Sequence, residues 1–314
     1  MSKHKMLLVE ADAAADLGAV CMDEAHFRKL SEEAQRPRLA GVSLFHPPAP
    51  NGRDPQLPAA FIPNPSALKL ALPNPSRVWE SLSAIRLDAA RLAGNGLFPN
   101  PSTEPAAAAF DMLRSRLLLV LAERGWRRIA ITSPTHGCGK TLVAANLALS
   151  LARRPASRVV LMDLELRRPG LANLLGLRET AAIRDFLTGA QSLESHFLRV
   201  GTTLALALNG APAADAAELL HSPDTSSALA AMMEQMDPEV VIIDMPPALV
   251  NDDVVALLPQ VDAVLLVADG TRTTPEDIKA CERMLEGRKP LLGVVLNRAQ
   301  ELTLGCNRHS RERG

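Results

Sequence analysis

Six apolar runs of strand length constrain the fold of this chain more than any other feature of its sequence. They cover residues 129–132, 159–162, 204–208, 240–243, 264–268 and 291–296. Helical patterns separate most of them, at 142–153, 216–236 and 275–286. Strands that are apolar along their whole length are typical of a parallel sheet covered by helices on both faces. The sequence therefore predicts an α/β fold with a mostly parallel sheet, and ligands are expected at the carboxyl ends of its strands.

The charge balance and the cysteines narrow the class of protein. The chain has 34 Lys and Arg against 35 Asp and Glu, so no global field exists to hold nucleic acid or an anionic membrane. The 4 cysteines lie far apart without metal-ligand spacing, which fits a reducing cytoplasm. No apolar run reaches the roughly 18 residues that a membrane-spanning helix requires. We therefore expect a cytoplasmic protein that does not bind nucleic acid.

The chain changes character near residue 105. Thirteen of its 24 prolines precede residue 106, which predicts a flexible, partly disordered Pro/Ala-rich extension over 1–75. Apolar residues at 78, 82, 85, 89 and 92 share one helical face, and they predict an amphipathic helix and linker over 76–105. That helix is expected to pack on the main domain, which is predicted over 106–298. Residues 299–314 are expected to form a flexible tail.

The first apolar run leads into a glycine-rich loop and then a helix. The loop reads Ser133-Pro-Thr-His-Gly-Cys-Gly-Lys-Thr141, with Pro134 where this motif usually begins with glycine. Its glycines let backbone amides turn around a phosphate, and the helix start adds its dipole. We expect Lys140 to reach the β- and γ-phosphate oxygens and the Thr141 hydroxyl to ligate magnesium. The predicted nucleotide contacts in this loop are Thr135, His136, Gly137, Cys138, Gly139, Lys140, Thr141 and Leu142.

Two later strands end in an aspartate. Asp163 follows the run 159–162, and Asp244 follows the run 240–243. An acid at the end of a buried strand loses hydration energy unless a cation or hydrogen-bond donors meet it. A helix-capping role would also explain Asp163 on its own. Asp244 is expected to hold a magnesium-bound water. Together with the loop, the two acids predict a nucleotide–magnesium site.

Residues 104–298 resemble the bacterial tyrosine kinases, cytoplasmic ATPase modules of capsule and exopolysaccharide assembly. The segments that carry the resemblance are 131–146, 159–170, 216–222, 240–247, 261–274 and 293–298. The resemblance implies a P-loop NTPase fold and ATP and Mg²⁺ as cofactors. It also implies that the catalytic residues are Lys140, Asp163 and Asp244, with Asp163 as base or magnesium partner.

The resemblance extends to the metal ligands and the base pocket. It implies that the metal ligands are Thr141, Asp163, Glu165 and Asp244. Glu165 stands where the family usually has a second aspartate. The strand that ends at Asn297 and Arg298 resembles the adenine-side edge of the family, so both are candidate nucleotide contacts and Asn297 a candidate contact to the base.

Three departures from the family bear on function. The chain has no tyrosine, so self-phosphorylation on tyrosine is impossible by composition. The family assembles into rings through a Glu and two Arg on the helix before the first strand, and the corresponding residues here are Ala108, Asp111 and Arg114. Only the last matches, so homo-oligomers through this route are an open expectation. Because no transmembrane sensor lies in the chain, a separate membrane co-polymerase is expected to supply the activating segment.

The leading hypothesis is an ATP–Mg²⁺ binding and hydrolysing module that regulates exopolysaccharide or capsule polymerisation and export as a nucleotide switch. One alternative is a kinase that phosphorylates tyrosine on a partner. Another is a positioning ATPase related to septum-site and partition proteins, although these carry a second lysine where this chain has Thr135. The third is a scaffold that binds nucleotide without turnover.

Overall fold

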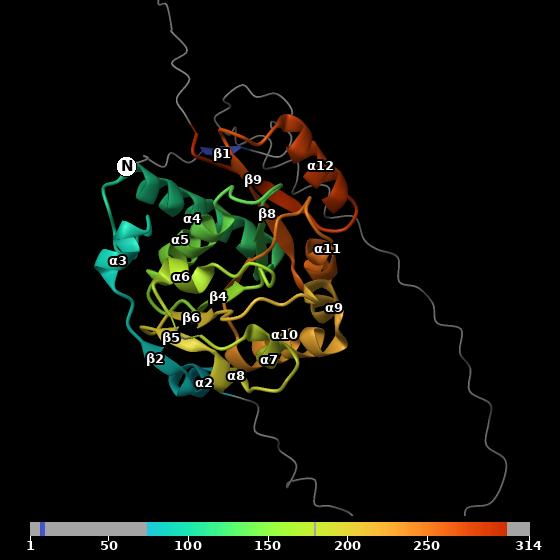
Figure 1. Cartoon of the computed structure of the whole chain (residues 1–314). Coiled ribbons are helices and arrows are strands. Elements are labelled where there is room, and N and C mark those ends of the chain that lie inside the picture. The colour runs from blue at the N-terminus through green and yellow to red at the C-terminus, as the bar shows by residue number, and fades with distance from the viewer. Residues whose placement is uncertain (1–6, 10–73, 179, 300–314) are drawn as a thin grey trace, which may run out of the picture. The chain divides into compact units, whose positions relative to one another are not determined.

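The computed structural model of the chain describes residues 7–9, 74–178 and 180–299, and the strands within them form one nine-stranded sheet (Figure 1). The strand order is β1-β9-β8-β3-β7-β4-β6-β5-β2. The strands are β1 (Leu7–Val9), β2 (Ser83–Ile85), β3 (Arg128–Thr132), β4 (Val159–Asp163), β5 (Leu198–Val200), β6 (Leu204–Ala207), β7 (Val240–Asp244), β8 (Ala263–Asp269) and β9 (Leu291–Asn297). The helices are α2 (Pro75–Ser81), α3 (Ala89–Gly94), α4 (Pro105–Arg124), α5 (Lys140–Ala152), α6 (Leu171–Leu175), α7 (Ile183–Leu187), α8 (Leu193–His196), α9 (Ala216–His221), α10 (Pro223–Met236), α11 (Asp253–Leu257), the 3-10 helix η2 (Leu258–Gln260) and α12 (Pro275–Leu285).

The six predicted strands are all present and form the centre of the sheet as β9, β8, β3, β7, β4 and β6. Each pairs in parallel with its neighbours in this group. Successive residues of a strand point to opposite faces. Accordingly, Val160 and Met162 belong to one apolar cluster, whereas Val159 and Leu161 belong to a second. Both faces of the sheet are therefore buried under helices, and the predicted fold class is confirmed.

The predicted helix over 216–236 is wrong in one respect, because it is two helices. α9 ends at His221, and α10 begins at Pro223. A proline ring fits only the first turn of a helix, and the Ser222 side chain accepts a hydrogen bond from the Asp224 amide there. The dipeptide Ser222-Pro223 therefore ends one helix and starts the next. The helices expected at 142–153 and 275–286 are α5 and α12.

The segment 74–104, which we call the strap, also differs from its prediction. The expected single amphipathic helix is instead α2, β2 and α3 in succession. Asp88 interrupts the helical pattern, because its carboxylate caps α3 by accepting the amides of Ala90 and Arg91. β2 pairs in parallel with β5 and forms one edge of the sheet. Trp79 lies in one apolar cluster and Leu92 in the other, so the strap passes around this edge from face to face.

The opposite edge of the sheet is formed by β1, which pairs antiparallel with β9. Three residues of the predicted flexible extension are thus a strand. Its last two residues, 74 and 75, lead into α2. The rest of that prediction, over residues 1–6 and 10–73, and the predicted tail beyond 299 lie outside the described residues. No helix in the described part of the chain combines the length and the apolar character that crossing a bilayer needs.

Candidate functional site

The glycine-rich loop connects β3 to α5 at the carboxyl end of the sheet. Thr135, His136, Gly137, Cys138 and Gly139 lie in the loop, and Lys140, Thr141 and Leu142 form the first turn of α5. Gly137 and Gly139 have φ values of 81° and 91°, which only glycine adopts without strain. A Cβ atom at Gly137 would also lie 2.8 Å from the Arg272 side chain. The backbone of the loop is therefore as tightly turned as the sequence predicts.

Lys140 is buried at the head of α5, with 8% of its surface exposed. Its ammonium nitrogen lies 3.0 Å from Glu165 Oε2 and 3.5 Å from Asp244 Oδ1. It also donates to the Thr141 hydroxyl at 3.4 Å. Burial lowers the pKa of Lys140, but the carboxylates of Asp244 and Glu165 outweigh this effect, so its pKa is raised. The lysine is a fixed positive charge at the point where the loop meets the strands.

Asp163 and Asp244 lie side by side at the ends of β4 and β7. The two residues are register partners, and both side chains are fully buried. Asp163 accepts the amides of Glu165 at 3.2 Å and of Leu171 at 3.1 Å. The second contact is at the start of α6, so Asp163 has part of the capping role considered above. Burial and the neighbouring Asp244 raise the pKa of Asp163 to about 8.

Asp244 has the features of a cation ligand. Its Oδ1 lies 3.5 Å from the Lys140 ammonium, but among the described residues neither carboxylate oxygen makes a hydrogen bond of good geometry. Burial raises the pKa of Asp244 even though the Lys140 ammonium opposes this effect, and a metal cation bound at the carboxylate would lower the pKa further. No three His, Cys, Asp or Glu side chains in the described part of the chain form a metal cluster by themselves. Magnesium in nucleotide sites takes one or two carboxylates and completes its shell with phosphates and water, so Asp244 and the Thr141 hydroxyl fit it.

Glu165 is placed differently from the other predicted metal ligands. Its carboxylate pairs with Lys140 and is almost fully buried. It therefore balances the lysine charge in this structure, and any contact to magnesium stays a prediction.

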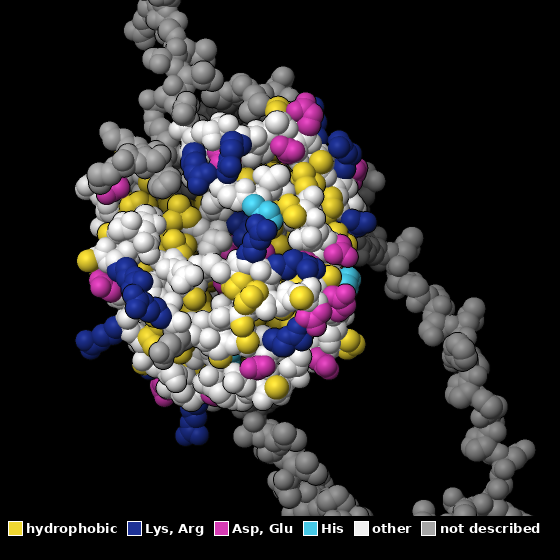
Figure 2. All heavy atoms as spheres, viewed as in Figure 1, with side chains coloured by type: hydrophobic (Ala, Val, Ile, Leu, Met, Phe, Trp, Pro, Cys, Tyr) yellow, Lys and Arg dark blue, Asp and Glu magenta, His cyan; other side chains and the backbone are white. Residues whose placement is uncertain are grey.

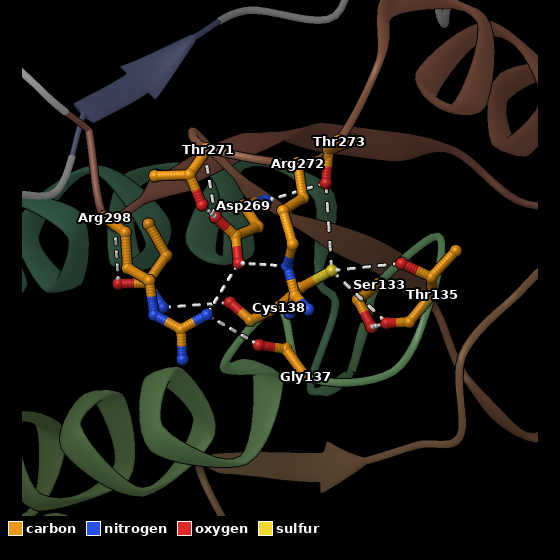
Figure 3. A network of polar contacts seen from close by, with 10 residues as sticks. Ser133, Thr135, Gly137, Cys138, Asp269, Thr271, Arg272, Thr273 and Arg298 are labelled. Carbon is orange, nitrogen blue, oxygen red and sulfur yellow. Dashed lines mark hydrogen bonds and ion pairs between the residues drawn. The ribbon is translucent and has the colours of Figure 1, made fainter.

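The ends of β8 and β9 close the other side of the loop (Figure 3). Asn297 donates to the Cys138 carbonyl at 2.9 Å, and Arg298 donates to the Gly137 carbonyl at 2.9 Å. Arg298 also pairs with Asp269 Oδ2 at 2.6 Å. The predicted contact of Asn297 to the base stays a prediction, whereas its contact to the loop is present. Asp269 was not singled out from the sequence, although it ends an apolar strand as Asp163 and Asp244 do.

The segment after β7 is attached to the back of the loop. Ala248 and Leu249 donate their amides to the carbonyls of Ser133 and Pro134, at 2.7 and 3.1 Å. The Thr132 hydroxyl donates to the Pro246 carbonyl at 2.6 Å. Leu249 and its neighbour Val250 are exposed. A movement of the glycine-rich loop would therefore reach this partly apolar surface segment directly.

Charged side chains of both signs mark this face. Figure 2 shows Lys, Arg and His side chains beside Asp or Glu side chains in the middle of the view, between the positions of α6 and α11 in Figure 1.

Two residues at the expected ring-forming positions make contacts within the chain instead. Asp111 accepts from Ser150 at 2.6 Å and from Arg114 at 3.2 Å, and it pairs with Arg153. Ala108 is exposed on the same helix, α4.

Comparison with known proteins places this site in a family. The family model described as ParA, NUBPL iron-transfer P-loop NTPase, matches residues 126–312, more than half of the chain. The chain belongs to this family of P-loop NTPases. The glycine-rich loop, Lys140 and the two strand-end acids all lie within the matched residues.

Individual relatives include bacterial tyrosine kinases and iron–sulfur proteins. A tyrosine-protein kinase named EpsB from Ralstonia solanacearum is 30% identical over 196 residues, which are 62% of this chain and 26% of EpsB. The chain thus spans about a quarter of the length of this relative. An iron–sulfur cluster carrier protein from Pseudomonas fragi is 31% identical over 189 residues, or 57% of this chain and 62% of the carrier. The crystal structure of the VpsO kinase domain has 29% identity and a TM-score of 0.54, covering 62% of this chain and 97% of that domain. The resemblance to bacterial tyrosine kinases is confirmed.

Proposed function

We propose that the chain binds ATP with Mg²⁺ at the glycine-rich loop, hydrolyses it, and acts as a nucleotide switch. The observation that carries this proposal is the buried ammonium of Lys140, held at the loop by Asp244 and Glu165. A buried ammonium beside the loop would attract the negative charge of a nucleotide polyphosphate. Binding of the polyphosphate would exchange one set of anions around Lys140 for another.

The residues divide the chemistry among themselves. Lys140 and the loop amides bind and orient the phosphates, and the Thr141 hydroxyl with Asp244 would hold Mg²⁺, which neutralises charge on the phosphate oxygens. Asp163 lies beside Asp244 and is placed to take a proton from the attacking water once a cation favours its ionised form. The catalytic roles of Lys140, Asp163 and Asp244 are thus proposed from position, burial and charge.

The switch would be read out by the segment after β7. Its backbone is hydrogen bonded to Ser133 and Pro134, and it ends at α11 with Leu249 and Val250 exposed. Phosphate at the loop orders such segments, and they relax after hydrolysis. Because the relatives include tyrosine kinases, we assign the switch to exopolysaccharide or capsule assembly, with a separate membrane co-polymerase as the partner that recruits and activates it from the cytoplasmic side.

A second candidate is a kinase that phosphorylates tyrosine on another protein. The observation that favours it is Asp163, a buried carboxylate beside Asp244 whose pKa is raised to about 8. The sequence has no tyrosine, so the acceptor would belong to a partner.

The test uses γ-labelled ATP, Mg²⁺ and a tyrosine-containing candidate partner, with Lys140→Met as the matched variant. The proposal predicts that labelled phosphate is released by the wild-type chain, that no protein is labelled, and that Lys140→Met releases none. Label on the partner that disappears in the variant would instead establish the kinase. ATP turnover that is unchanged by Lys140→Met would overturn the assignment of the site.

A further inference from the structure

The β8–β9 edge holds the phosphate loop through a buried carboxylate. Asp269 is fully buried at the end of β8, next to its register partner Asn297 at the end of β9. Its Oδ1 accepts the amide and hydroxyl of Thr271 at 2.9 and 2.6 Å, and its Oδ2 accepts Arg298 Nη1 at 2.6 Å. Burial alone would raise the pKa of Asp269, but the Thr271 and Arg298 contacts lower it to about 2. The carboxylate is therefore a permanent anchor for Arg298.

Arg298 connects Asp269 to the glycine-rich loop. The same Nη1 that contacts Asp269 donates to the Gly137 carbonyl at 2.9 Å (Figure 3). Asn297 Nδ2 donates to the next carbonyl, that of Cys138. Arg298 has a φ of 56°, a left-handed conformation that is unfavourable for residues other than glycine. Its contacts must offset this strain. Two successive carbonyls of the loop are thus held from the same side.

Holding these carbonyls determines where the loop amides point. A peptide unit is planar, and its C=O and N–H groups point in opposite directions. The Gly137 carbonyl shares its peptide unit with the Cys138 amide, and the Cys138 carbonyl shares its unit with the Gly139 amide. With both carbonyls turned toward β9, both amides face away from it. Among the described residues, neither of these two amides has a hydrogen-bond acceptor.

Free, convergent amides are the part of a phosphate loop that contacts the anion. We propose that Arg298, anchored by Asp269, is a positioning residue that presets the Cys138 and Gly139 amides for a polyphosphate. This inference deepens the proposed function and rests on it, since it concerns the same loop. It assigns Arg298 and Asp269 a role in positioning the loop for phosphate, and it leaves the predicted contact of Asn297 to the base untouched.

The experiment measures displacement of a fluorescent ADP analogue from the full chain by ADP and by inorganic diphosphate. The variants are Arg298→Ala, Asp269→Ala and the double variant. The matched control is Arg288→Ala, which removes an arginine that also donates to a carbonyl, that of Met284 at 2.9 Å, but on α12. Thermal unfolding without ligand shows whether each variant is folded.

The inference predicts that Arg298→Ala and Asp269→Ala each weaken both ligands about tenfold, as expected for loss of a charge-assisted contact. The double variant should bind no more weakly than Arg298→Ala, and Arg288→Ala should bind as the wild type. Wild-type affinity in a folded Arg298→Ala, or additive losses in the double variant, would overturn the inference alone. A folded wild-type chain that does not bind the fluorescent ADP analogue, but is protected by inorganic diphosphate in hydrogen exchange of residues 133–141, would instead overturn the proposed function.

If Arg298→Ala does not fold, Arg298→Lys provides the second test, because it keeps the charge beside Asp269. Hydrogen exchange of a peptide covering residues 133–141 is then compared with and without inorganic diphosphate. The inference predicts a smaller protection by diphosphate in Arg298→Lys than in the wild type. Equal protection in both would overturn it.

Discussion

Replacing Asp163 by asparagine should stabilise the nucleotide-free protein while it impairs the site. The carboxyl has a pKa of about 8 in the folded chain against 3.8 as its ordinary value. Between these values the folded state binds one more proton than the unfolded state, so stability falls as the pH rises through this window. pH 7 lies about 3 pH units above the ordinary pKa of 3.8. The free energy of unfolding is therefore about 4 kcal/mol lower at pH 7 than at a pH below 3.8.

Asp163→Asn removes this destabilisation, but it also loses a hydrogen bond. Asp163 accepts two amides, those of Glu165 and Leu171, and an asparagine oxygen can accept only one of them in the same geometry. An unpaired buried amide costs about 1–3 kcal/mol. The net stabilisation expected for Asp163→Asn at pH 7 is therefore about 1–3 kcal/mol, and it should disappear near pH 5.

Urea unfolding at pH 5, 7 and 8 measures this difference, with Glu80→Gln as a control because Glu80 is an exposed carboxylate on α2. The control should shift little at any pH. A variant that is less stable than the wild type at pH 7 and 8, or one that gains as much at pH 5 as at pH 8, would refute the reasoning. The first result would mean that the capping hydrogen bonds dominate. The second would mean that the proton on Asp163 is not the cause.

Three further predictions concern the core and the loop. His196 is buried against Phe186 and its pKa is lowered by burial, so stability should be lost as the pH falls below about 6.5; His196→Phe should reduce this loss in urea unfolding at pH 5 compared with pH 7.5, and equal losses in both proteins would argue against it. Trp79→Ala should destabilise by about 3–5 kcal/mol, because the ring is buried and its N–H donates to the Met236 carbonyl at 2.8 Å, with Trp79→Phe less affected in the same assay. Gly139→Ala should abolish binding of a fluorescent ATP analogue, since its φ of 91° is left-handed and Asn297 contacts the Cβ position; binding at wild-type affinity would show that the loop can adopt another shape.

The centre of the fold was predictable because each strand is apolar on both faces. Such runs can be recognised from consecutive residues alone. The residues that follow them at the strand ends then indicated the loop, Asp163 and Asp244 as the site. The strap was not predictable in the same way. Five apolar residues at 78–92 fit a helical spacing, but Asp88 caps α3 and β2 is held by pairing with β5, a contact 115 residues away in sequence. A pairing partner at that distance leaves no periodic signal.

The details of the site show the same limit. The sequence identified Lys140 and Glu165 but gave no sign that they pair, because the contact exists only when the start of α5 meets the end of β4. Asp269 carried a readable signal, an acid at the end of an apolar strand, and was overlooked. The contacts of Asn297 and Arg298 to loop carbonyls depend on the register of β8 and β9, which composition and spacing do not encode.

The central claim is that Lys140 and its loop bind ATP with Mg²⁺, and calorimetric titration of the purified full chain with ATP tests it most directly. The wild type should bind one ATP, with weaker binding when Mg²⁺ is removed by EDTA. Lys140→Met should bind at least about 100-fold more weakly, since it removes a charge-assisted contact to the phosphates in a buried site. Equal affinity of the folded variant and the wild type, with or without Mg²⁺, would contradict the account.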